Sequence, residues 1–329
     1  MKEITAFPRL RLAQLPTPLH RLPNISAMTG LNVYIKRDDM TGLGLGGNKV
    51  RKLEFLLAEA LEQGCDVVLT TGGAQSNHAM LTAACCNRLG LSCILVLKKR
   101  GVWTRQGNQL LDDLLGAEVR FVDTDDYGQV YAQMEAICQE LRQQGHKPCC
   151  IPVGGSVGLG ALGYALCVEE ILAQTAAMHV QLDHMICCAG SGGTMAGIVL
   201  GALLYAPQLK VTGIAIEPDD FAGIVARLVN EAAALLESPL HIQPQDLHLY
   251  DCYGEGYAIP SPEGNAAIRT MARKEGLILD PVYTGKTFAG FLELCEKGYF
   301  APGSNVLFLH SGGAGGLFAL GEQVLSGRL

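Results

Sequence analysis

Two lysines at the start of an expected helix are the residues best suited to covalent chemistry. Two glycines and Asn48 precede this helix, and apolar residues recur with helical spacing over 53–61. Asn48 is expected to cap the helix through its side-chain oxygen. Lys49 would then lie in the first turn, where the helix dipole disfavours an ammonium, with Lys52 one turn further on the same side. In a dry site Lys49 would become a nucleophilic amine able to form a Schiff base; otherwise both are solvated surface lysines.

A second polar turn follows the expected strand 66–71 and precedes the expected helix 78–89. It presents two amides and a hydroxyl, those of Gln75, Ser76 and Asn77. Backbone N–H groups and the dipole at a helix N-terminus attract anions, so this turn suits a carboxylate, and Ser76 is placed to move a proton. The alternative is an ordinary helix cap.

A third turn, Gly190-Ser191-Gly192-Gly193-Thr194, lies between an apolar strand and an expected helix. Consecutive glycines let backbone N–H groups converge into a phosphate nest, although close helix packing also selects small residues. A nicotinamide enzyme stays open as a weaker alternative. Met195 stands where its fingerprint needs a third glycine, but Glu217 ends the next strand and could bind a ribose.

The remaining candidates are hydroxyl groups near turns. Ser311 follows the strand 307–310 and would present a neutral hydroxyl, whereas His310 is expected to be a packed strand-end residue. Tyr257 and Tyr283 lie in loops, where tyrosine stacks, hydrogen-bonds or relays protons, or is simply half buried.

These turns need parallel sheets to bring them together, because ligands bind at the carboxyl edge of open α/β sheets. Strands and helices alternate from residue 66 to 152, which predicts a parallel α/β sheet, and a second α/β unit begins after Gly154. We predict a smaller α/β domain at 50–155, inserted into a larger one made of 1–49 and 156–329. Residues 1–30 are expected to be irregular. Further strands are expected at 185–189, 211–216 and 306–310, and helices at 163–173, 194–205, 221–236 and 263–275.

Composition narrows the class of partner. The 329 residues are 49% hydrophobic and 17% charged, with a net charge of −7, which describes a well-buried globular protein with no basic surface for nucleic acid. A small-molecule partner is expected. The uncharged run 185–209 is broken by its glycine turn, which favours a buried strand and helix over a membrane span. Twelve cysteines, mostly in apolar runs and without zinc spacing, fit free thiols in the cytoplasm and no metal site.

Six motifs in this order resemble the D-cysteine desulfhydrase/1-aminocyclopropane-1-carboxylate (ACC) deaminase family over nearly the whole chain. The family consists of pyridoxal-phosphate (PLP) enzymes with the tryptophan-synthase-β-like fold, usually homodimers. The resemblance rests on Pro16-Thr17-Pro18-Leu19, Lys36-Arg37-Asp38-Asp39, Gly47-Asn48-Lys49-Val50-Arg51-Lys52-Leu53-Glu54, Gln75-Ser76-Asn77-His78, Gly190-Ser191-Gly192-Gly193-Thr194 and Asp280-Pro281-Val282-Tyr283-Thr284-Gly285-Lys286.

The resemblance implies a role for each candidate residue. Lys49 would carry PLP covalently, and Asn48 or Asn77 would contact it. Lys52 and the backbone of 190–194 would hold its phosphate. Gln75, Ser76 and Asn77 would bind the substrate carboxylate, and Tyr257 and Tyr283 would line the active site.

Two positions favour the desulfhydrase branch. The deaminase pattern has Glu directly after the second tyrosine and Leu in the last glycine turn, where this chain has Thr284 and Ser311. Hydroxyls facing the pyridine nitrogen make the ring a weaker electron sink, which suits elimination of a good β-leaving group better than opening of a cyclopropane. The expected reaction converts D-cysteine to pyruvate, ammonia and hydrogen sulfide, with Lys49 or Ser76 removing the Cα proton. L-Cysteate, D-serine, β-chloro-D-alanine and ACC stay open as substrates, as does a non-catalytic PLP carrier.

Overall fold

The protein is an α/β molecule built on two sheets, as the alternating strands and helices predict. The structure is a computed structural model that describes residues 1–252 and 254–325. The larger sheet has six strands in the order β1-β2-β10-β7-β8-β9, all parallel except β1. Its strands are β1 (Leu19–Arg21), β2 (Asn32–Arg37), β10 (Asn305–His310), β7 (His184–Ala189), β8 (Lys210–Ala215) and β9 (His248–Asp251). The fold class is therefore confirmed, with one antiparallel edge strand added.

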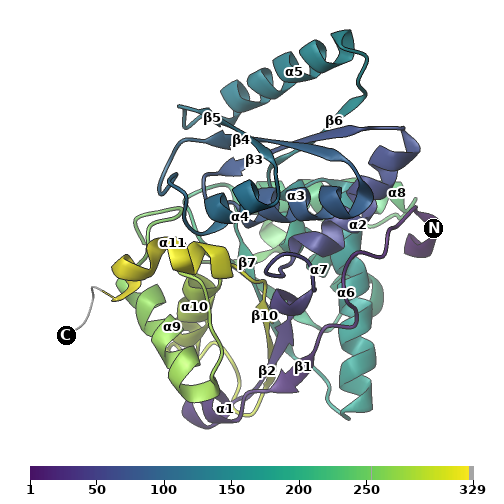
Figure 1. Cartoon of the computed structure of the whole chain (residues 1–329). Coiled ribbons are helices and arrows are strands. Elements are labelled where there is room, and N and C mark those ends of the chain that lie inside the picture. Colours follow the sequence, from purple (N-terminus) through teal and green to yellow (C-terminus); the bar gives the residue numbers. More distant parts are fainter. Residues whose placement is uncertain (253, 326–329) are drawn as a thin grey trace.

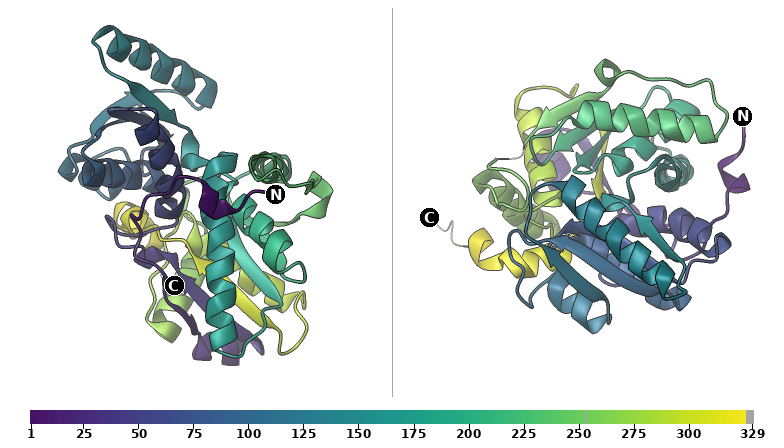
Figure 2. Two further views of the ribbon diagram at one scale, coloured as in Figure 1. Left: turned by 90° about the vertical axis from the view of Figure 1, so that its right-hand side faces the viewer. Right: turned by 90° about the horizontal axis from the view of Figure 1, so that it is seen from above.

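The smaller sheet is fully parallel, in the order β5-β4-β3-β6. Its strands are β5 (Glu118–Val122), β4 (Ser92–Lys98), β3 (Val67–Gly73) and β6 (Pro148–Ile151). Side chains alternate between the two faces of a strand, so one face packs on α5 (Tyr127–Gln143) and the other on α2 (Lys49–Glu62), α3 (Asn77–Leu89) and α4 (Asn108–Leu114). Figure 2 shows α5 as the outermost layer. All four strands fall inside 50–155; the domain boundaries themselves stay a prediction.

Helices cover both faces of the larger sheet (Figure 1). One face packs on α6 (Gly158–Ala177), α7 (Gly193–Tyr205) and α8 (Phe221–Leu235), and the other on α1 (Pro23–Thr29), α9 (Pro262–Glu275) and α10 (Thr284–Glu296). Helix α11 (Ala314–Leu325) follows β10, and short 3₁₀ turns lie at Ile4–Ala6, Asp38–Met40, Val153–Gly155 and Pro244–Asp246. The uncharged run 185–209 is a strand and a helix, and no described helix is long and apolar enough to cross a membrane.

The expectation of an irregular segment over 1–30 is wrong. Strand β1 pairs with β2, and α1 begins with Pro23 at its first position and ends at Gly30, which has a left-handed φ of 71°. Proline at the start and glycine after the end are favoured helix signals, so local residues did mark this helix. Helices α10 and α11 are also absent from the sequence prediction.

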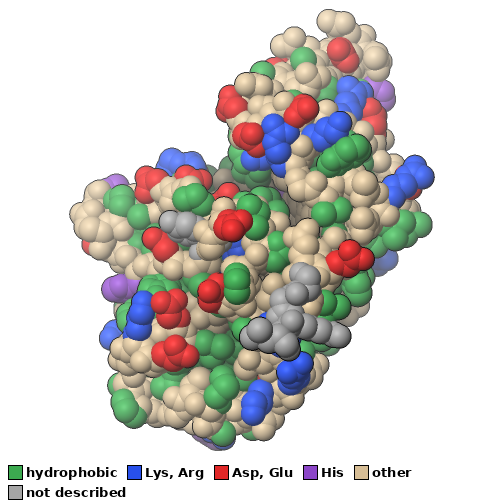
Figure 3. Space-filling view, turned by 90° about the vertical axis from the view of Figure 1, so that its left-hand side faces the viewer, with side chains coloured by type: hydrophobic (Ala, Val, Ile, Leu, Met, Phe, Trp, Pro, Cys, Tyr) green, Lys and Arg blue, Asp and Glu red, His purple; other side chains and the backbone are tan. Residues whose placement is uncertain are grey.

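The sheet edges that carry the polar turns face each other where the two sheets meet. Figure 3 shows a hollow where the lobe built on the smaller sheet joins the rest of the molecule. A cavity there is lined by residues from both sheets and has an empty volume of about 750 Å³, open solvent at its mouth included.

Candidate active site

Helix α2 begins at Lys49, and a tight turn at two glycines aims it at the cavity. Gly46 has φ 73°, and a Cβ there would lie 1.8 Å from the Asp39 carbonyl oxygen, so only glycine fits. Asn48 precedes the helix but does not cap it, which corrects the sequence expectation. Its side chain instead donates a hydrogen bond of 2.9 Å to the Thr194 hydroxyl, because α7 begins beside it in the fold.

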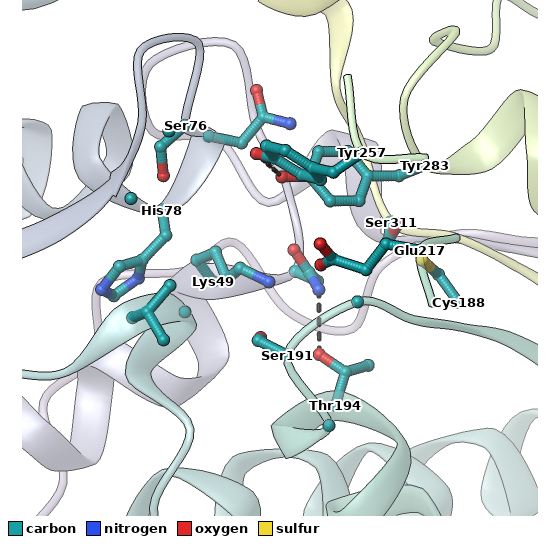
Figure 4. Close-up of a pocket in the computed structure, with 18 of the residues that line it drawn as sticks. Lys49, Ser76, His78, Cys188, Ser191, Thr194, Glu217, Tyr257, Tyr283 and Ser311 are labelled. Carbon is teal, nitrogen blue, oxygen red and sulfur yellow. Dashed lines mark hydrogen bonds between the residues drawn. The ribbon is translucent and has the colours of Figure 1, made fainter. Parts of the chain in front are cut away.

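The Lys49 side chain points into the cavity (Figure 4) and is only partly exposed. Burial disfavours its ammonium form and lowers its pKa from 10.5 to about 8. The sequence argument used the helix dipole; in the structure the cause is loss of solvent. A substantial fraction of a lysine with this pKa is a neutral amine near neutral pH, which is the form that attacks an aldehyde.

A buried lysine, Lys52, backs the glycine turn at the start of α7. The Lys52 side chain has no exposed surface, and its Nζ donates to the Gly154 carbonyl oxygen over 2.9 Å. No carboxylate in the described chain pairs with this nitrogen, and burial together with Lys49 lowers its pKa well below 10.5. A Cβ on Gly193 would lie 2.7 Å from Lys52 Nζ, so glycine at this position lets the Lys52 nitrogen come close to the start of α7. A buried cation without a counter-ion at a glycine-rich helix N-terminus fits the phosphate of PLP.

The turn after β3 contributes Ser76 and Asn77 to the cavity. Ser76 Oγ accepts a hydrogen bond from the Ala79 N–H over 3.2 Å, so the residue caps α3 and also faces the cavity. Asn77 Oδ1 accepts from the side chain of Asn108 over 2.7 Å, which fixes its orientation. Both are therefore held at a helix N-terminus suited to a carboxylate.

The structure does not bring the Gln75 side chain to the cavity. Its Nε2 donates to the carbonyl oxygens of Val102 and Gln106, and its Oε1 accepts from the Asn108 N–H. These bonds use the amide to anchor the loop before α4. A side-chain contact between Gln75 and a substrate, as the resemblance implies, would require breaking them.

Tyr257 and Tyr283 form one unit in the cavity wall. Their hydroxyl oxygens are 2.7 Å apart, and their rings meet edge to face with centroids 5.9 Å apart. Tyr257 reaches across to the smaller sheet, where a Cβ on Gly73 would lie 2.9 Å from its ring. Burial raises the pKa of Tyr257 to about 12 and that of Tyr283 well above 10. Both phenols therefore stay protonated near neutral pH and act as hydrogen-bond donors.

Of the two hydroxyls that distinguish the family branches, only one lies in the cavity. Ser311 lines it, and its carbonyl oxygen accepts from the Asn48 N–H. Thr284 is fully buried outside it: its hydroxyl donates to Asp280 Oδ1 over 2.7 Å and accepts from the Asp280 N–H over 2.8 Å. The expectation that Thr284 faces a cofactor ring is therefore wrong in geometry, because the residue closes the turn that starts α10.

The structure thus gathers most of the sequence-selected residues in a single cavity. Lys52 and Gly193 lie directly behind it, and Gln75 and Thr284 lie away from it. The sequence-selected residues that line it are Lys49, Asn48, Ser76, Asn77, Gly190, Ser191, Gly192, Thr194, Tyr257, Tyr283 and Ser311. Glu217, which the nicotinamide alternative had assigned to a ribose, lines the same cavity as Lys49.

Sequence reasoning missed further cavity residues, among them His78, Lys98, Tyr127 and Cys188. Lys98 ends β4, and in register it lies opposite Gly73, the end of β3. The rule that carboxyl ends of neighbouring parallel strands meet at one edge could have found it. Tyr127 begins α5, and no spacing along the chain marks it as a cavity residue.

Comparisons with known proteins identify the family of this chain. The sequence model of the family described as "Pyridoxal-phosphate dependent enzyme" matches residues 10–312. A Pyrococcus horikoshii protein provisionally named a 1-aminocyclopropane-1-carboxylate deaminase is 44% identical over 326 residues, covering 98% of this chain and 97% of its own. The D-cysteine desulfhydrase of Yersinia enterocolitica is 41% identical, with 98% of each chain covered. A crystal structure of an ACC deaminase homologue superposes with a TM-score of 0.92 at 43% identity, covering 98% of this chain and 97% of that one.

Proposed function

The chain belongs to the pyridoxal-phosphate-dependent enzymes, and from that premise we propose that it eliminates the β-substituent of a small amino acid, preferably D-cysteine. The products are then pyruvate, ammonia and hydrogen sulfide. One observation carries the proposal: the partly buried amine of Lys49, with a pKa of about 8, shares a cavity with a carboxylate-binding turn and a glycine turn backed by Lys52.

The position of each residue in the cavity determines its role in the proposed reaction. Lys49 attaches the cofactor through its amine, while Lys52 and the α7 N-terminus hold the phosphate. The bound cofactor supplies an electron sink for the electrons of the Cα–H bond. The N-terminus of α3, with Ser76 and Asn77, holds the substrate carboxylate and so fixes which Cα substituent faces Lys49. Either the Lys49 amine or the Ser76 hydroxyl removes the Cα proton, since both face the cavity.

The preference for a sulfur leaving group rests on Ser311, which lines the cavity. Its neutral hydroxyl would leave the nitrogen of a bound pyridine ring largely unprotonated, whereas a carboxylate there would favour protonation. The weaker electron sink suits a good leaving group on Cβ better than a cyclopropane. Relatives at about the same identity are named for both activities, so L-cysteate, D-serine and ACC remain alternative substrates of the same site.

The nicotinamide alternative has lost its support. Its dinucleotide would occupy the Gly190 turn with a ribose on Glu217, but the family match identifies PLP as the cofactor. A buried lysine amine in the same cavity also has no task in hydride transfer.

The test is a screen of the purified protein for release of a 2-oxo acid from D-cysteine, L-cysteine, L-cysteate, D-serine and ACC. D-Cysteine should give the highest kcat/KM, with sulfide and pyruvate formed in equal amounts. Fastest turnover of ACC would reject the sulfur preference, and no turnover of any β-substituted alanine would leave a PLP carrier as the better description.

A variant of Lys49 tests the covalent attachment. Lysine-bound PLP absorbs at about 410–430 nm, and borohydride removes this band. Lys49→Ala should lack the band and all turnover while melting as a folded protein. Lys99→Ala, whose lysine lies outside the cavity lining, is the matched control and should keep both. Normal activity of Lys49→Ala would reject the mechanism.

The proposal includes a homodimer in the cytoplasm. All twelve cysteines are free thiols, which suits a reducing compartment. Sedimentation of the purified protein at about 70 kDa, twice the chain mass of 35.0 kDa, would support the dimer.

A further inference from the structure

Lys98 brings a cation into the cavity that neither phosphate nor carboxylate binding uses. It ends β4, opposite Gly73 in register, and lines the same cavity as Lys49. Its Nζ lies 3.9 Å from the ring centroid of Tyr127, which also lines the cavity. A ring face attracts an ammonium without satisfying its hydrogen bonds, so its donors stay available.

Within the described part of the chain no carboxylate forms an ion pair with this ammonium, although Glu217 and Asp125 attract it from further away. In residues 1–252 and 254–325 its nitrogen forms neither a hydrogen bond nor an ion pair. The charged groups that act on it are Glu217, Asp125 and Arg100. Burial lowers the pKa of Lys98, and attraction to Glu217 opposes this only in part. Burial also raises the pKa of Glu217, although Lys98 and Lys286 act on that carboxyl in the opposite direction. Lys98 is therefore a half-buried donor with room for an anionic partner.

The reaction releases one further anion besides the phosphate and the carboxylate, the departing β-substituent. The phosphate is assigned to Lys52 and α7, and the substrate carboxylate to the N-terminus of α3. Lys98 is the cavity-lining cation that has neither of these tasks, and it therefore suits the departing anion.

We propose that Lys98 is a catalytic residue that receives the departing β-substituent and selects substrates whose leaving group is a hydrogen-bonding anion. This rests on the proposed β-elimination. The Cα proton goes to Lys49 or Ser76, and the Cα–H electron pair forms the Cα=Cβ bond. The Cβ–S electron pair leaves with sulfur, which accepts a hydrogen bond from Lys98, and its proton where the anion is basic enough. No oxidant or reductant is consumed.

The kinetic test compares leaving groups. Sulfide from cysteine and sulfite from cysteate accept strong hydrogen bonds, whereas chloride from β-chloroalanine needs no proton. Lys98→Met should lower kcat/KM for cysteine and cysteate by about tenfold to a hundredfold, the size of a charge-assisted hydrogen bond, and for β-chloroalanine by less than about threefold. Lys98→Arg should restore most of the loss. Lys99→Met is the matched control: its lysine is the next residue and rests over Trp103, so all three rates should stay at wild-type values.

An equilibrium measurement gives a readout independent of turnover. The affinities of the PLP-loaded protein for alanine and aspartate, both enantiomers of each, are measured by calorimetry, because aspartate carries a carboxylate on Cβ and alanine does not. Lys98→Met should weaken aspartate binding by at least about tenfold and leave alanine binding unchanged.

The outcomes separate this proposal from the proposed function. Equal losses for chloride and sulfur leaving groups, or for alanine and aspartate, would overturn the role of Lys98 even if elimination is observed. No elimination by the wild type would overturn the proposed function and, with it, the catalytic role of Lys98, whatever the binding data show. Selective loss in both tests supports it.

Discussion

The Asn48 side chain donates a hydrogen bond of 2.9 Å to the Thr194 hydroxyl and so joins the start of helix α2 to the start of α7. The two residues are 146 positions apart, and both line the cavity. This bond places the amine of Lys49 at a fixed position relative to the glycine turn that suits a phosphate. The aldehyde and the phosphate of a cofactor would therefore meet the Lys49 amine and the glycine turn at positions that are already fixed, which reduces the entropy lost on binding.

Lys52→Met should weaken cofactor binding without removing the covalent attachment site. Methionine keeps the length of the side chain but removes the charge that faces Gly193. We expect the dissociation constant for PLP to rise by about tenfold to a hundredfold, since a hydrogen bond to a charged group contributes about 1.5–3 kcal/mol. Spectral titration of the cofactor-free protein measures it. The exposed Lys147→Met serves as control, and an unchanged constant for Lys52→Met would show that this nitrogen does not reach the phosphate.

The stability of the cofactor-free protein should rise with pH because of Lys49. Its pKa is about 8 in the folded protein and 10.5 at its reference value, so the unfolded chain binds more protons between these pH values. The free energy of unfolding therefore increases through this interval, and the penalty is fully present below about pH 8. Between pH 7 and pH 10 the free energy of unfolding of the wild type should increase by about 1–3 kcal/mol more than that of Lys49→Met. This range allows for the partly exposed side chain.

Urea unfolding of both cofactor-free proteins at matched pH values measures this gain. Other titrating groups contribute equally to the two proteins and cancel in the difference. A difference that stays constant with pH would mean that the Lys49 ammonium is not desolvated.

Ser76→Ala should lower both stability and turnover, whereas Ser261→Ala should lower stability alone. Ser76 caps α3, and Ser261 caps α9 by accepting from the Gly264 N–H over 3.0 Å, but only Ser76 lines the cavity. Each alanine variant should lower the free energy of unfolding by about 1 kcal/mol. Turnover should fall by about a hundredfold or more for Ser76→Ala, because general acid–base groups contribute that much, and stay near wild type for Ser261→Ala. Equal turnover in the two variants would leave Lys49 as the base.

Thr284 and Ser311 should respond differently to substitution. Thr284→Val removes two hydrogen bonds with Asp280 and should lower the free energy of unfolding by about 2–3 kcal/mol, with an unchanged ratio of kcat/KM for D-cysteine over ACC. Ser311→Ala should lower the turnover of D-cysteine, and Ser311→Thr should retain it. Thr284→Glu would bury a carboxylate beside Asp280 and should lower the free energy of unfolding more than Thr284→Val does. A changed ratio in Thr284→Val would place Thr284 in contact with the cofactor after all.

Side-chain direction explains where sequence reasoning failed in the site. Gln75 directly precedes Ser76 and Asn77 in the turn suited to a carboxylate, yet its amide is used by a loop about 30 residues further along the chain. Thr284 follows a cavity tyrosine but faces the interior of its own turn. Asparagine is a favoured residue for a helix cap, but the Asn48 side chain donates its hydrogen bond to the distant Thr194 instead.

The sequence by itself determined the local units: a lysine at a helix start, a polar turn after β3, a glycine turn before α7 and the alternating strands that require parallel sheets. Short-range spacing and turn chemistry specify these, because neighbours along the chain make the contacts involved. The tertiary structure alone decided that Tyr127 enters the same cavity as Lys49, and that no carboxylate of the described chain pairs with the buried Lys52. Desolvation and long-range pairing set these properties, and both depend on which strands and helices pack together.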